Sequence, residues 1–430
     1  MKNKKLRVAL IYPNRYAKYN LRDSPLIRLP PLNLLTIAGL TPREYYIEIV
    51  DERYEKIDFT RDYDLVGITA LTCNASRAYE IARRFHENGA KTVLGGIHPT
   101  IMPDEAKKYA DSVVIGEAET SWQILLRDIQ EGNLRPFYNE GLADLKETPV
   151  PRWDLLPNHT NYLGFVQTSR GCPNNCSFCI VPRLSGRKVR TKPIGKVIDE
   201  IKKIGKRMVV FVDDNILAKK YYAKELFKAL RPLKIRWGSE ASINLLEDPE
   251  LIELSSQSGA RAFYIGIETI RKKGLNCLNK TFNKIYDFKN VIKRLHRHGI
   301  AVIGSLMFGT DEDDPEVFVE TLDFLDNVGI DGATFSILTP MPGTYLFEQF
   351  KKEGRIFTFD WSKYDALHTV YKPKRMSVED LQKGLKKTYK KFYSFSRVIR
   401  RSLRSIKISP FLSYFNFALM KYGKGGLTPE

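Results

Sequence analysis

The sequence RGCPNNCSFC at residues 170–179 places Cys172, Cys176 and Cys179 in the spacing Cys-x3-Cys-x2-Cys. A [4Fe–4S] cluster normally has a cysteine at each iron, so three cysteines leave one iron open to a ligand that is not protein. An apolar segment, 163–168, precedes the cysteines and predicts a β-strand. A Lys- and Arg-rich segment, 183–192, follows them and could face an anionic cluster.

The same cysteines allow two simpler interpretations. They could bind zinc together with His159, the nearest histidine, or they could be ordinary buried thiols. The strand before the cysteines and the basic segment after them favour the iron–sulfur interpretation over both.

The cysteine spacing directly after a strand resembles the signature of the radical S-adenosylmethionine (SAM) enzymes. The resemblance implies that the amino and carboxylate groups of SAM close the open iron. It also implies that an electron from the cluster cleaves SAM to a 5′-deoxyadenosyl radical, which requires a reductant such as flavodoxin or ferredoxin. A non-catalytic iron–sulfur or zinc protein, which would release no 5′-deoxyadenosine, is the alternative outside the enzymes.

Cysteine usage and hydropathy bear on the compartment. Five cysteines in 430 residues are too few and too clustered for a disulfide scaffold. Cys73 and Cys277, outside the trio, are expected to be small core residues. An exposed thiolate cluster needs a reducing compartment, and no run approaches the roughly 20 apolar residues of a membrane span. A cytoplasmic location is therefore predicted.

The chain begins with strands and helices in alternation. We expect strands at 6–12, 46–51, 65–70, 92–95 and 112–115, and helices at 32–40, 75–88, 103–109 and 122–130. This α/β pattern predicts a doubly wound parallel sheet in residues 1–135, with ligands at the carboxyl ends of its strands. Polar and glycine-containing loops fall at those ends. They could hold a cofactor or nucleotide, or the glycines could simply make turns.

The layout of the first 135 residues resembles the cobalamin-binding domain that is fused to one large class of radical SAM enzymes. The shared features are Pro-Leu-Asn-Leu at 31–34, the Gly-Gly-x-His loop and Gly-Glu-x-Glu at 116–119. The resemblance implies that Thr69 and Thr72 lie near the corrin, that Gly95, Gly96 and His98 line the nucleotide tail, and that Gly116 and Glu117 flank it. The Asp-x-His-x-x-Gly motif of other cobalamin proteins is absent, so cobalt would have no histidine beneath it, or the domain would bind no cobalamin.

A proline-rich linker, 136–160, leads to a second alternating segment at 161–375. We expect strands at 163–168, 208–213, 235–241, 262–267, 301–308 and 333–338, with helices at 196–206, 220–230, 249–259, 282–298 and 315–328. Six strand–helix units fit the partial (β/α)6 barrel of the radical SAM family, whose active site lies at the carboxyl ends of the strands.

Polar residues gather at those predicted strand ends. Alone, each of the carboxylates there could be a helix cap or a surface acid. The resemblance implies that this set contacts SAM: Asp213, Asp214, Glu240, Ser242, Glu268 and Gly304. The sequence identifies no general base, and hydrogen abstraction by a radical needs none.

Residues 376–430 form a basic tail. From 371 to 430 there are 15 Lys and Arg against 3 Asp and Glu, which accounts for +12 of the net charge of +19. We expect one long helix at 378–406, with interleaved aromatics and further aromatics at Phe411, Tyr414, Phe415 and Phe417. The aromatics could pack on the barrel and leave the lysines in water. They could instead favour an anionic membrane surface or, less well, nucleic acid.

The resemblance as a whole implies an enzyme that methylates an unactivated carbon, with methylcobalamin as the methyl donor and a second SAM to restore it. A hydrophobic substrate, lipid or tetrapyrrole, is the preferred class. Ring closure, carbon–carbon bond formation or rearrangement without methyl transfer is the alternative. RNA modification is disfavoured because the related enzymes carry three cysteines in the N-terminal domain, where this chain has only Cys73.

Overall fold

The structure is a computed structural model that describes residues 5–14, 28–156, 162–283, 288–406 and 416–417. It contains two compact units. Unit 1 comprises Met1–Leu163, Arg183–Ser185 and Asp360–Asp365. Unit 2 comprises Gly164–Pro182, Gly186–Phe359 and Ala366–Glu430.

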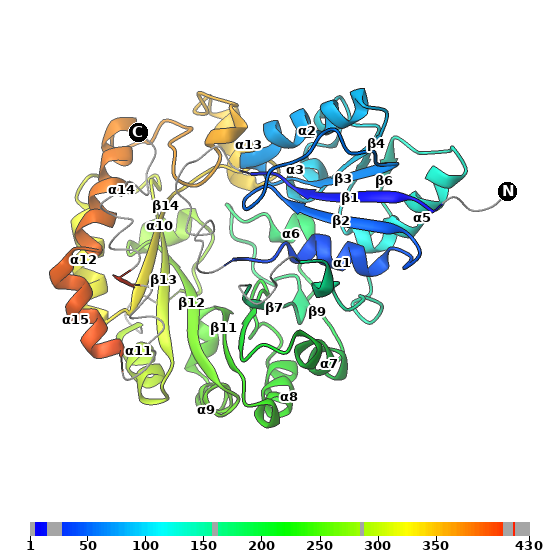
Figure 1. The fold of residues 1–430 in the computed structure, drawn as a ribbon. Coiled ribbons are helices and arrows are strands. Elements are labelled where there is room, and N and C mark those ends of the chain that lie inside the picture. Colours follow the sequence, from blue (N-terminus) through cyan, green and yellow to red (C-terminus); the bar gives the residue numbers. More distant parts are fainter. Residues whose placement is uncertain (1–4, 15–27, 157–161, 284–287, 407–415, 418–430) are drawn as a thin grey trace. The chain divides into compact units, whose positions relative to one another are not determined.

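Unit 1 is built on a parallel sheet of six strands in the order β2-β1-β3-β4-β5-β6 (Figure 1). The strands are β1 (Arg7–Tyr12), β2 (Tyr46–Asp51), β3 (Leu65–Thr69), β4 (Lys91–Gly95), β5 (Ser112–Val114) and β6 (Phe137–Tyr138). All five residues of β3 are buried, which is expected of a central parallel strand that is covered on both faces. The predicted doubly wound sheet is confirmed, and the segment predicted as a linker contributes its sixth strand.

Helices cover both faces of this sheet (Figure 1). They are α1 (Leu32–Leu40), α2 (Ala75–Glu87), α3 (Ile97–Ile101), α4 (Pro103–Ala106) and α5 (Ala118–Gln130). Helices α1 and α5 pack together on one face, while α2 lies against β3 and β4 and α3 lies against β4 and β5. The helix predicted at 103–109 begins at Pro103 as expected but ends at Ala106, and Lys107, Lys108 and Tyr109 form turns instead.

Unit 2 contains a second parallel sheet of six strands in the order β14-β13-β12-β11-β10-β7 (Figure 1). The strands are β7 (Gly164–Val166), β10 (Met208–Phe211), β11 (Arg236–Ala241), β12 (Ala260–Glu268), β13 (Ala301–Phe308) and β14 (Gly332–Ile337). Because neighbours in the sheet follow one another along the chain, the six strand–helix units form the partial barrel that was predicted.

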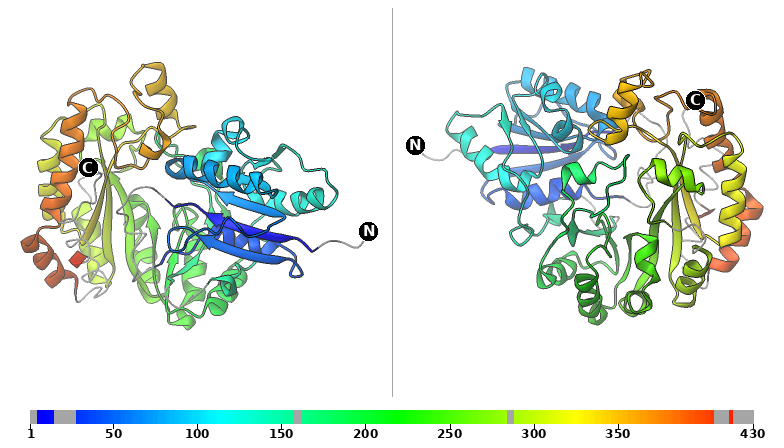
Figure 2. Two further views of the ribbon diagram at one scale, coloured as in Figure 1. Left: turned by 45° about the horizontal axis from the view of Figure 1, so that its top comes forward. Right: turned by 180° about the vertical axis from the view of Figure 1, so that it is seen from behind.

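The helices between these strands lie along the outer side of the sheet (Figure 2). They are α7 (Ile194–Ile204), α8 (Lys220–Leu230), α9 (Pro249–Gln257), α11 (Phe288–Arg297) and α12 (Val317–Val328). Between sheet and helices, the Trp237 ring packs on Phe211, Phe227 and Phe263 with centroids 5.0–5.8 Å apart. This core orders one face of the strands and leaves their carboxyl ends for polar groups.

The basic tail forms two helices, α14 (Val378–Phe392) and α15 (Phe395–Ser405), so the prediction of one continuous helix is wrong. Ser394, with ψ of 151°, is extended and interrupts the helical backbone. The Tyr389 and Tyr393 hydroxyls donate to the Phe335 and Ala333 carbonyls of β14, at 2.8 and 2.6 Å. These aromatics, one in α14 and one directly after it, therefore pack on the barrel, while Phe411, Tyr414 and Phe415 lie outside the described residues.

Within the described part of the chain, no helix combines the length and apolarity that crossing a bilayer requires.

Candidate active site and cofactor-binding loops

The three cysteines lie in the loop that follows β8 (Ser169–Arg170), a short strand paired with β9 (Arg190–Thr191). Gly171 opens the loop with a φ of +95°, and a Cβ there would meet the Lys188 carbonyl oxygen at 2.6 Å. Only glycine allows this turn without strain.

Two segments far along the chain hold this loop in place. The Ser177 amide donates to the Leu278 carbonyl at 3.0 Å, just after α10 (Lys272–Cys277). The Asn279 side chain donates to the Asn175 carbonyl at 2.8 Å, and the Leu346 amide donates to the Ser177 carbonyl at 2.9 Å. The cysteine loop is thus ordered by tertiary contacts and not by its own sequence alone.

The three thiols of the loop are partly withdrawn from water. Burial raises the pKa of all three thiols. The pKa rises to about 11 for Cys176 and to about 12 for Cys179, and that of Cys172 is raised as well. The thiols lie close enough that the charge of Cys172 also raises the pKa of Cys176 and of Cys179. Iron would bind them as thiolates and remove this cost, so the donor set fits an iron–sulfur cluster. His159, the ligand of the zinc alternative, lies outside the described residues.

Asp213 and Asp214 follow β10 and bind the cysteine loop. The Asp213 carboxylate is buried and accepts from the Thr168 and Ser169 hydroxyls at 2.9 and 2.6 Å. Burial raises the pKa of Asp213 to about 6, although these hydrogen bonds lower it. The Asp214 carboxylate accepts from the Gly171 amide at 2.9 Å. The predicted contacts with SAM stay predictions, and the observed role of both is to fix the loop.

Lys280 is a residue that the sequence did not single out. It forms a buried ion pair with Glu268, the predicted SAM contact at the end of β12. Lys280 also lies near the cysteines, since its charge lowers the pKa of Cys172 and Cys176 against the effect of burial. No local pattern marks this lysine, because only the turn at Asn279, with φ of +51°, brings it back to the loop.

The backbone around Glu268 is unusual. Glu268 has a φ of +66°, which is rare for a residue with a side chain, and the register between β12 and β13 shifts there. A Cβ at Gly266 would collide with the Glu268 carboxylate and the Lys280 ammonium. The strand end is therefore shaped around the ion pair.

The remaining SAM predictions lie on β11 and β13. The Ser242 hydroxyl accepts from the Asn215 side chain at 2.8 Å, which joins the ends of β11 and β10. Glu240 is exposed. Gly304 lies among buried aliphatic side chains, where a Cβ would meet Ile267 Cδ1 at 2.8 Å. Core packing therefore explains this glycine, and its contact with SAM stays a prediction.

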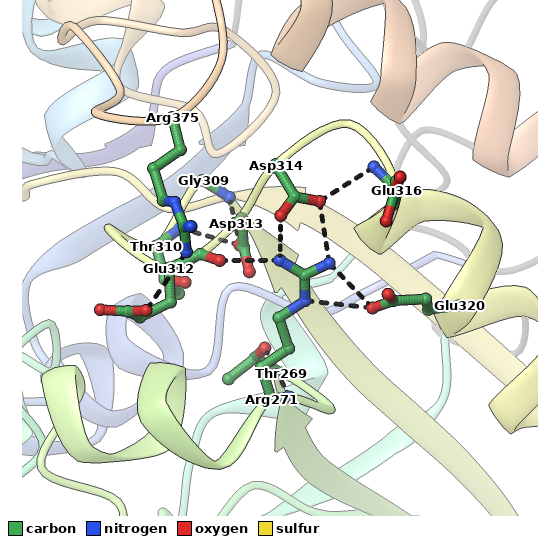
Figure 3. A network of polar contacts seen from close by, with 10 residues as sticks. All are labelled: Thr269, Arg271, Gly309, Thr310, Glu312, Asp313, Asp314, Glu316, Glu320 and Arg375. Atoms are coloured by element: carbon green, nitrogen blue, oxygen red, sulfur yellow. Dashed lines mark hydrogen bonds and ion pairs between the residues drawn. The ribbon is translucent and has the colours of Figure 1, made fainter.

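An arginine joins the ends of β12 and β13 (Figure 3). The Arg271 guanidinium donates to both carboxylate oxygens of Asp314 at 2.8 and 2.9 Å, and to Glu320 at 2.9 and 3.0 Å. It also donates to the Glu312 carbonyl at 2.7 Å. The neighbouring Asp313 accepts from the Gly309 amide at 2.9 Å, so the whole loop after β13 is held by charged groups.

Replacing Arg271 with methionine should lower the free energy of unfolding by about 2 kcal/mol, because charge-assisted hydrogen bonds are lost and two carboxylates are left facing each other. Chemical denaturation would measure this change. Lys273→Met, at an exposed lysine of α10, is the control and should change stability by less than about 0.5 kcal/mol. Equal stabilities of the two variants would contradict the prediction.

In unit 1, the predicted cofactor loops meet at the carboxyl ends of β3 and β4. Thr69 accepts from the Asn33 side chain at 2.7 Å. Gly96, with φ of +94°, lies so close that a Cβ would meet the Thr69 hydroxyl at 2.7 Å. At Gly95 there is more room: a Cβ added there would have Val114 Cβ, 3.8 Å away, as its nearest neighbour. The two loops therefore pack directly against each other.

His98 and Thr72 lie beneath these loops. His98 is completely buried, and its Nδ1 and Nε2 atoms lie 3.3 Å from the Thr72 hydroxyl and 3.4 Å from Glu105 Oε1. The ring of His98 faces the interior of unit 1 in this structure, and its predicted place along a nucleotide tail stays a prediction. Sequence cannot distinguish a loop histidine that faces a ligand from one that faces the core.

Gly116 and Glu117 lie at the end of β5. The Gly116 amide donates to the Thr100 hydroxyl at 3.0 Å, and Glu117 accepts from the Ala143 amide at 2.7 Å. Both residues fix neighbouring loops, and their predicted place beside a cofactor stays a prediction.

The two cysteines outside the loop differ. Cys73 is buried, as expected of a core residue, whereas Cys277 is exposed, so the prediction for Cys277 is wrong. Cys277 ends the short helix α10, and its carbonyl accepts from the Ser177 hydroxyl at 3.2 Å.

Two family models match the chain. The radical SAM superfamily matches residues 166–325, and the B12 binding domain matches residues 29–126. The first match contains the cysteine loop, and the second contains the loops after β3, β4 and β5.

Curated relatives extend over nearly the whole chain. Bacteriochlorophyllide d C-12(1)-methyltransferase of Chlorobaculum tepidum is 34% identical, over 95% of this chain and 91% of that protein. Hopanoid C-2 methylase of Rhodopseudomonas palustris is 28% identical, over 81% and 71%. Anaerobic magnesium-protoporphyrin IX monomethyl ester cyclase of Rubrivivax gelatinosus is 26% identical, over 90% and 77%.

Among solved structures, the fold is similar to that of the radical S-adenosylmethionine methyltransferase TsrM of Kitasatospora setae with cobalamin and a [4Fe–4S] cluster bound. The TM-score is 0.74 at 16% identity, over 98% of this chain and 100% of that one. At this identity the likeness concerns the fold alone.

Proposed function

Because this chain belongs to the cobalamin-binding methyltransferases of the radical SAM superfamily, we propose that it methylates an unactivated carbon of a hydrophobic small molecule. The observation that carries the proposal is the loop of three partly buried cysteines beside the buried Lys280–Glu268 pair, in a chain that also matches a B12 binding domain.

The cofactors are a [4Fe–4S] cluster on Cys172, Cys176 and Cys179, SAM, and cobalamin in unit 1. When bound, they supply one-electron reduction, a carbon-centred radical and a methyl group. The chain's own residues position these groups. Asp213 and Asp214 fix the cysteine loop, and Lys280 places a cation where the carboxylate of SAM or the anionic cluster would need one.

The remaining proposed SAM contacts are hydrogen bonds accepted by side-chain oxygens. Glu240 and Ser242 provide such oxygens at the end of β11, and Glu268 provides them at the end of β12. Gly304 belongs to the same proposed set. In unit 1, the proposed cobalamin loops are formed or supported by the predicted residues of that domain: Thr69, Thr72, Gly95, Gly96, His98, Gly116 and Glu117.

The substrate class follows from the relatives, two of which act on bacteriochlorophyllide d and on hopanoids by name. We therefore include tetrapyrroles and polycyclic lipids in the proposal. The test incubates the reconstituted protein with reductant, methyl-deuterated SAM and either bacteriochlorophyllide d or a hopanoid. A product heavier by one labelled methyl group in place of hydrogen supports it, and 5′-deoxyadenosine formation with no labelled product from either would contradict it.

Cyclisation without methyl transfer is the second candidate, since one relative is by name a cyclase of magnesium-protoporphyrin IX monomethyl ester. The same incubation with that ester separates the two functions, because cyclisation leaves no SAM-derived methyl group in the product.

We further propose that the enzyme is cytoplasmic and associates with an anionic membrane surface. The proposed reductant is flavodoxin or ferredoxin. Helix α14 exposes Lys383, Lys386, Lys387, Lys390 and Lys391. Helix α15 and the residue that follows it expose the apolar side chains of Phe395, Leu403 and Ile406 at 62%, 71% and 54%. Cations beside exposed apolar side chains suit the headgroup region of an anionic bilayer, from which a hydrophobic substrate could be taken.

Sedimentation with phosphatidylserine vesicles tests this surface. We expect the full-length protein to bind at low salt and to be released by high salt, and Leu403→Ser to bind less. Phosphatidylcholine vesicles are the control. Failure of the protein to sediment at low salt would contradict membrane association and leave the proposed chemistry intact.

A further inference from the structure

Residues 360–365 belong to unit 1, although the chain before and after them belongs to unit 2. They form the short helix η8 (Trp361–Lys363), which Asp360 caps by accepting from the Ser362 amide at 3.1 Å. Trp361 is 9% exposed and Tyr364 is fully buried. Helix η8 lies against α2 and against η2 (Thr72–Asn74), the turn after β3.

Trp361 meets two polar residues of unit 1. Its indole N–H donates to Glu105 Oε1 at 2.8 Å, and its ring contacts the His98 ring with centroids 5.3 Å apart. The Tyr79 hydroxyl donates to the same Glu105 oxygen at 3.0 Å. Burial raises the pKa of Glu105, but the hydrogen bonds from His98, Tyr79 and Trp361 outweigh it and lower the pKa. Glu105 is therefore a carboxylate that depends on these donors.

The two ring contacts of His98 are compatible with one neutral tautomer. With Glu105 as the acceptor, His98 carries its proton on Nε2, and its Nδ1 accepts from the Thr72 hydroxyl. The His98 amide also donates to the Ala70 carbonyl at 3.0 Å, and the Ala70 amide donates to the Gly95 carbonyl at 2.8 Å. The Trp361–Glu105–His98 contacts thus join the loop after β4 to the loop after β3.

We propose that Trp361, acting through Glu105 and His98, is a positioning residue for cobalamin: it holds the loops after β3 and β4 in the arrangement that binds the corrinoid. The inference rests on the proposed use of cobalamin by unit 1. A segment from beyond the barrel strands thereby completes the corrinoid site, and it lies outside the part of the chain, residues 29–126, that matches the B12 binding domain. Loops that are already ordered lose less entropy on binding, so loosening them weakens affinity.

The test measures binding of hydroxocobalamin to the full-length protein by its visible spectrum. Trp361→Phe keeps an aromatic ring and removes the N–H donor, and we expect it to weaken binding about tenfold. Trp153→Phe is the matched control, because Trp153 lies in the same unit and its buried Nε1 has no hydrogen-bond partner among the described residues. It should bind like the wild type.

A second variant separates positioning from general loss of structure. Glu105→Gln should weaken hydroxocobalamin binding to a similar degree, and the double variant should bind no more weakly than the weaker single variant, because both changes remove the same link. Thermal unfolding should show all variants folded at the assay temperature, with iron content unchanged.

If Trp361→Phe binds hydroxocobalamin with wild-type affinity, the inference about Trp361 is overturned, while the proposed use of cobalamin is not. Additive losses in the double variant, or weak binding that only follows a fall in the folded fraction, would also overturn it. If the wild-type protein itself takes up no hydroxocobalamin, the proposed use of cobalamin fails with it, and this result is seen before any variant is compared.

Discussion

Replacing Cys176 with alanine will abolish the iron–sulfur cluster and with it the cleavage of SAM. The expected iron content after anaerobic reconstitution falls from about four atoms per chain to less than about one. The physical reason is that two thiolates cannot hold a cluster whose open iron already lacks a protein ligand. The same loss is expected for Cys172→Ala and Cys179→Ala, because the three thiols lie in one ordered loop.

The measurement is iron analysis together with the yield of 5′-deoxyadenosine under a chemical reductant. Cys277→Ala is the matched control, since Cys277 is exposed and contributes only its backbone carbonyl to the cysteine loop. It should keep the iron and the 5′-deoxyadenosine of the wild type. A cluster that survives in Cys176→Ala, or that is lost in Cys277→Ala, would refute the assignment of ligands.

Apart from the cysteine substitutions, Lys280→Met is the single change that we expect to destabilise the protein most. It leaves the Glu268 carboxylate buried without its cation, in a region where both side chains are almost inaccessible to water. Breaking a buried ion pair by removing one partner costs about 3–5 kcal/mol. SAM binding should also weaken, because a cation beside the cysteine loop is lost.

Chemical denaturation and equilibrium SAM binding measure the two effects. The double variant Glu268→Gln/Lys280→Met should regain about 1–3 kcal/mol relative to the sum of the single variants, because no uncompensated charge remains. Lys272→Met, at an exposed lysine at the start of α10, is the control and should be close to the wild type. Strictly additive effects of the two single changes would show that the ion pair is not coupled.

The sequence by itself determined the architecture and pointed to the cysteines that are the predicted metal ligands, because both depend on local patterns. Alternation of apolar strands with helices predicts two parallel sheets, and the boundaries of α1, α8 and β13 agree with the prediction to the residue. A three-cysteine motif is recognisable without any tertiary contact. The tail helix failed as a prediction because its interruption at Ser394 accompanies hydrogen bonds from Tyr389 and Tyr393 to β14.

Only the tertiary structure decided which polar residues face which neighbours. The sequence predicts a loop position beside a ligand for His98 and a core position for Cys277, yet His98 is buried within unit 1 and Cys277 is exposed. Lys280 and Trp361 carry no local signal, because their partners lie 12 and 256 residues away in the chain. Burial and long-range hydrogen bonding depend on how distant segments pack, and periodicity reports only on the nearest turns and strands.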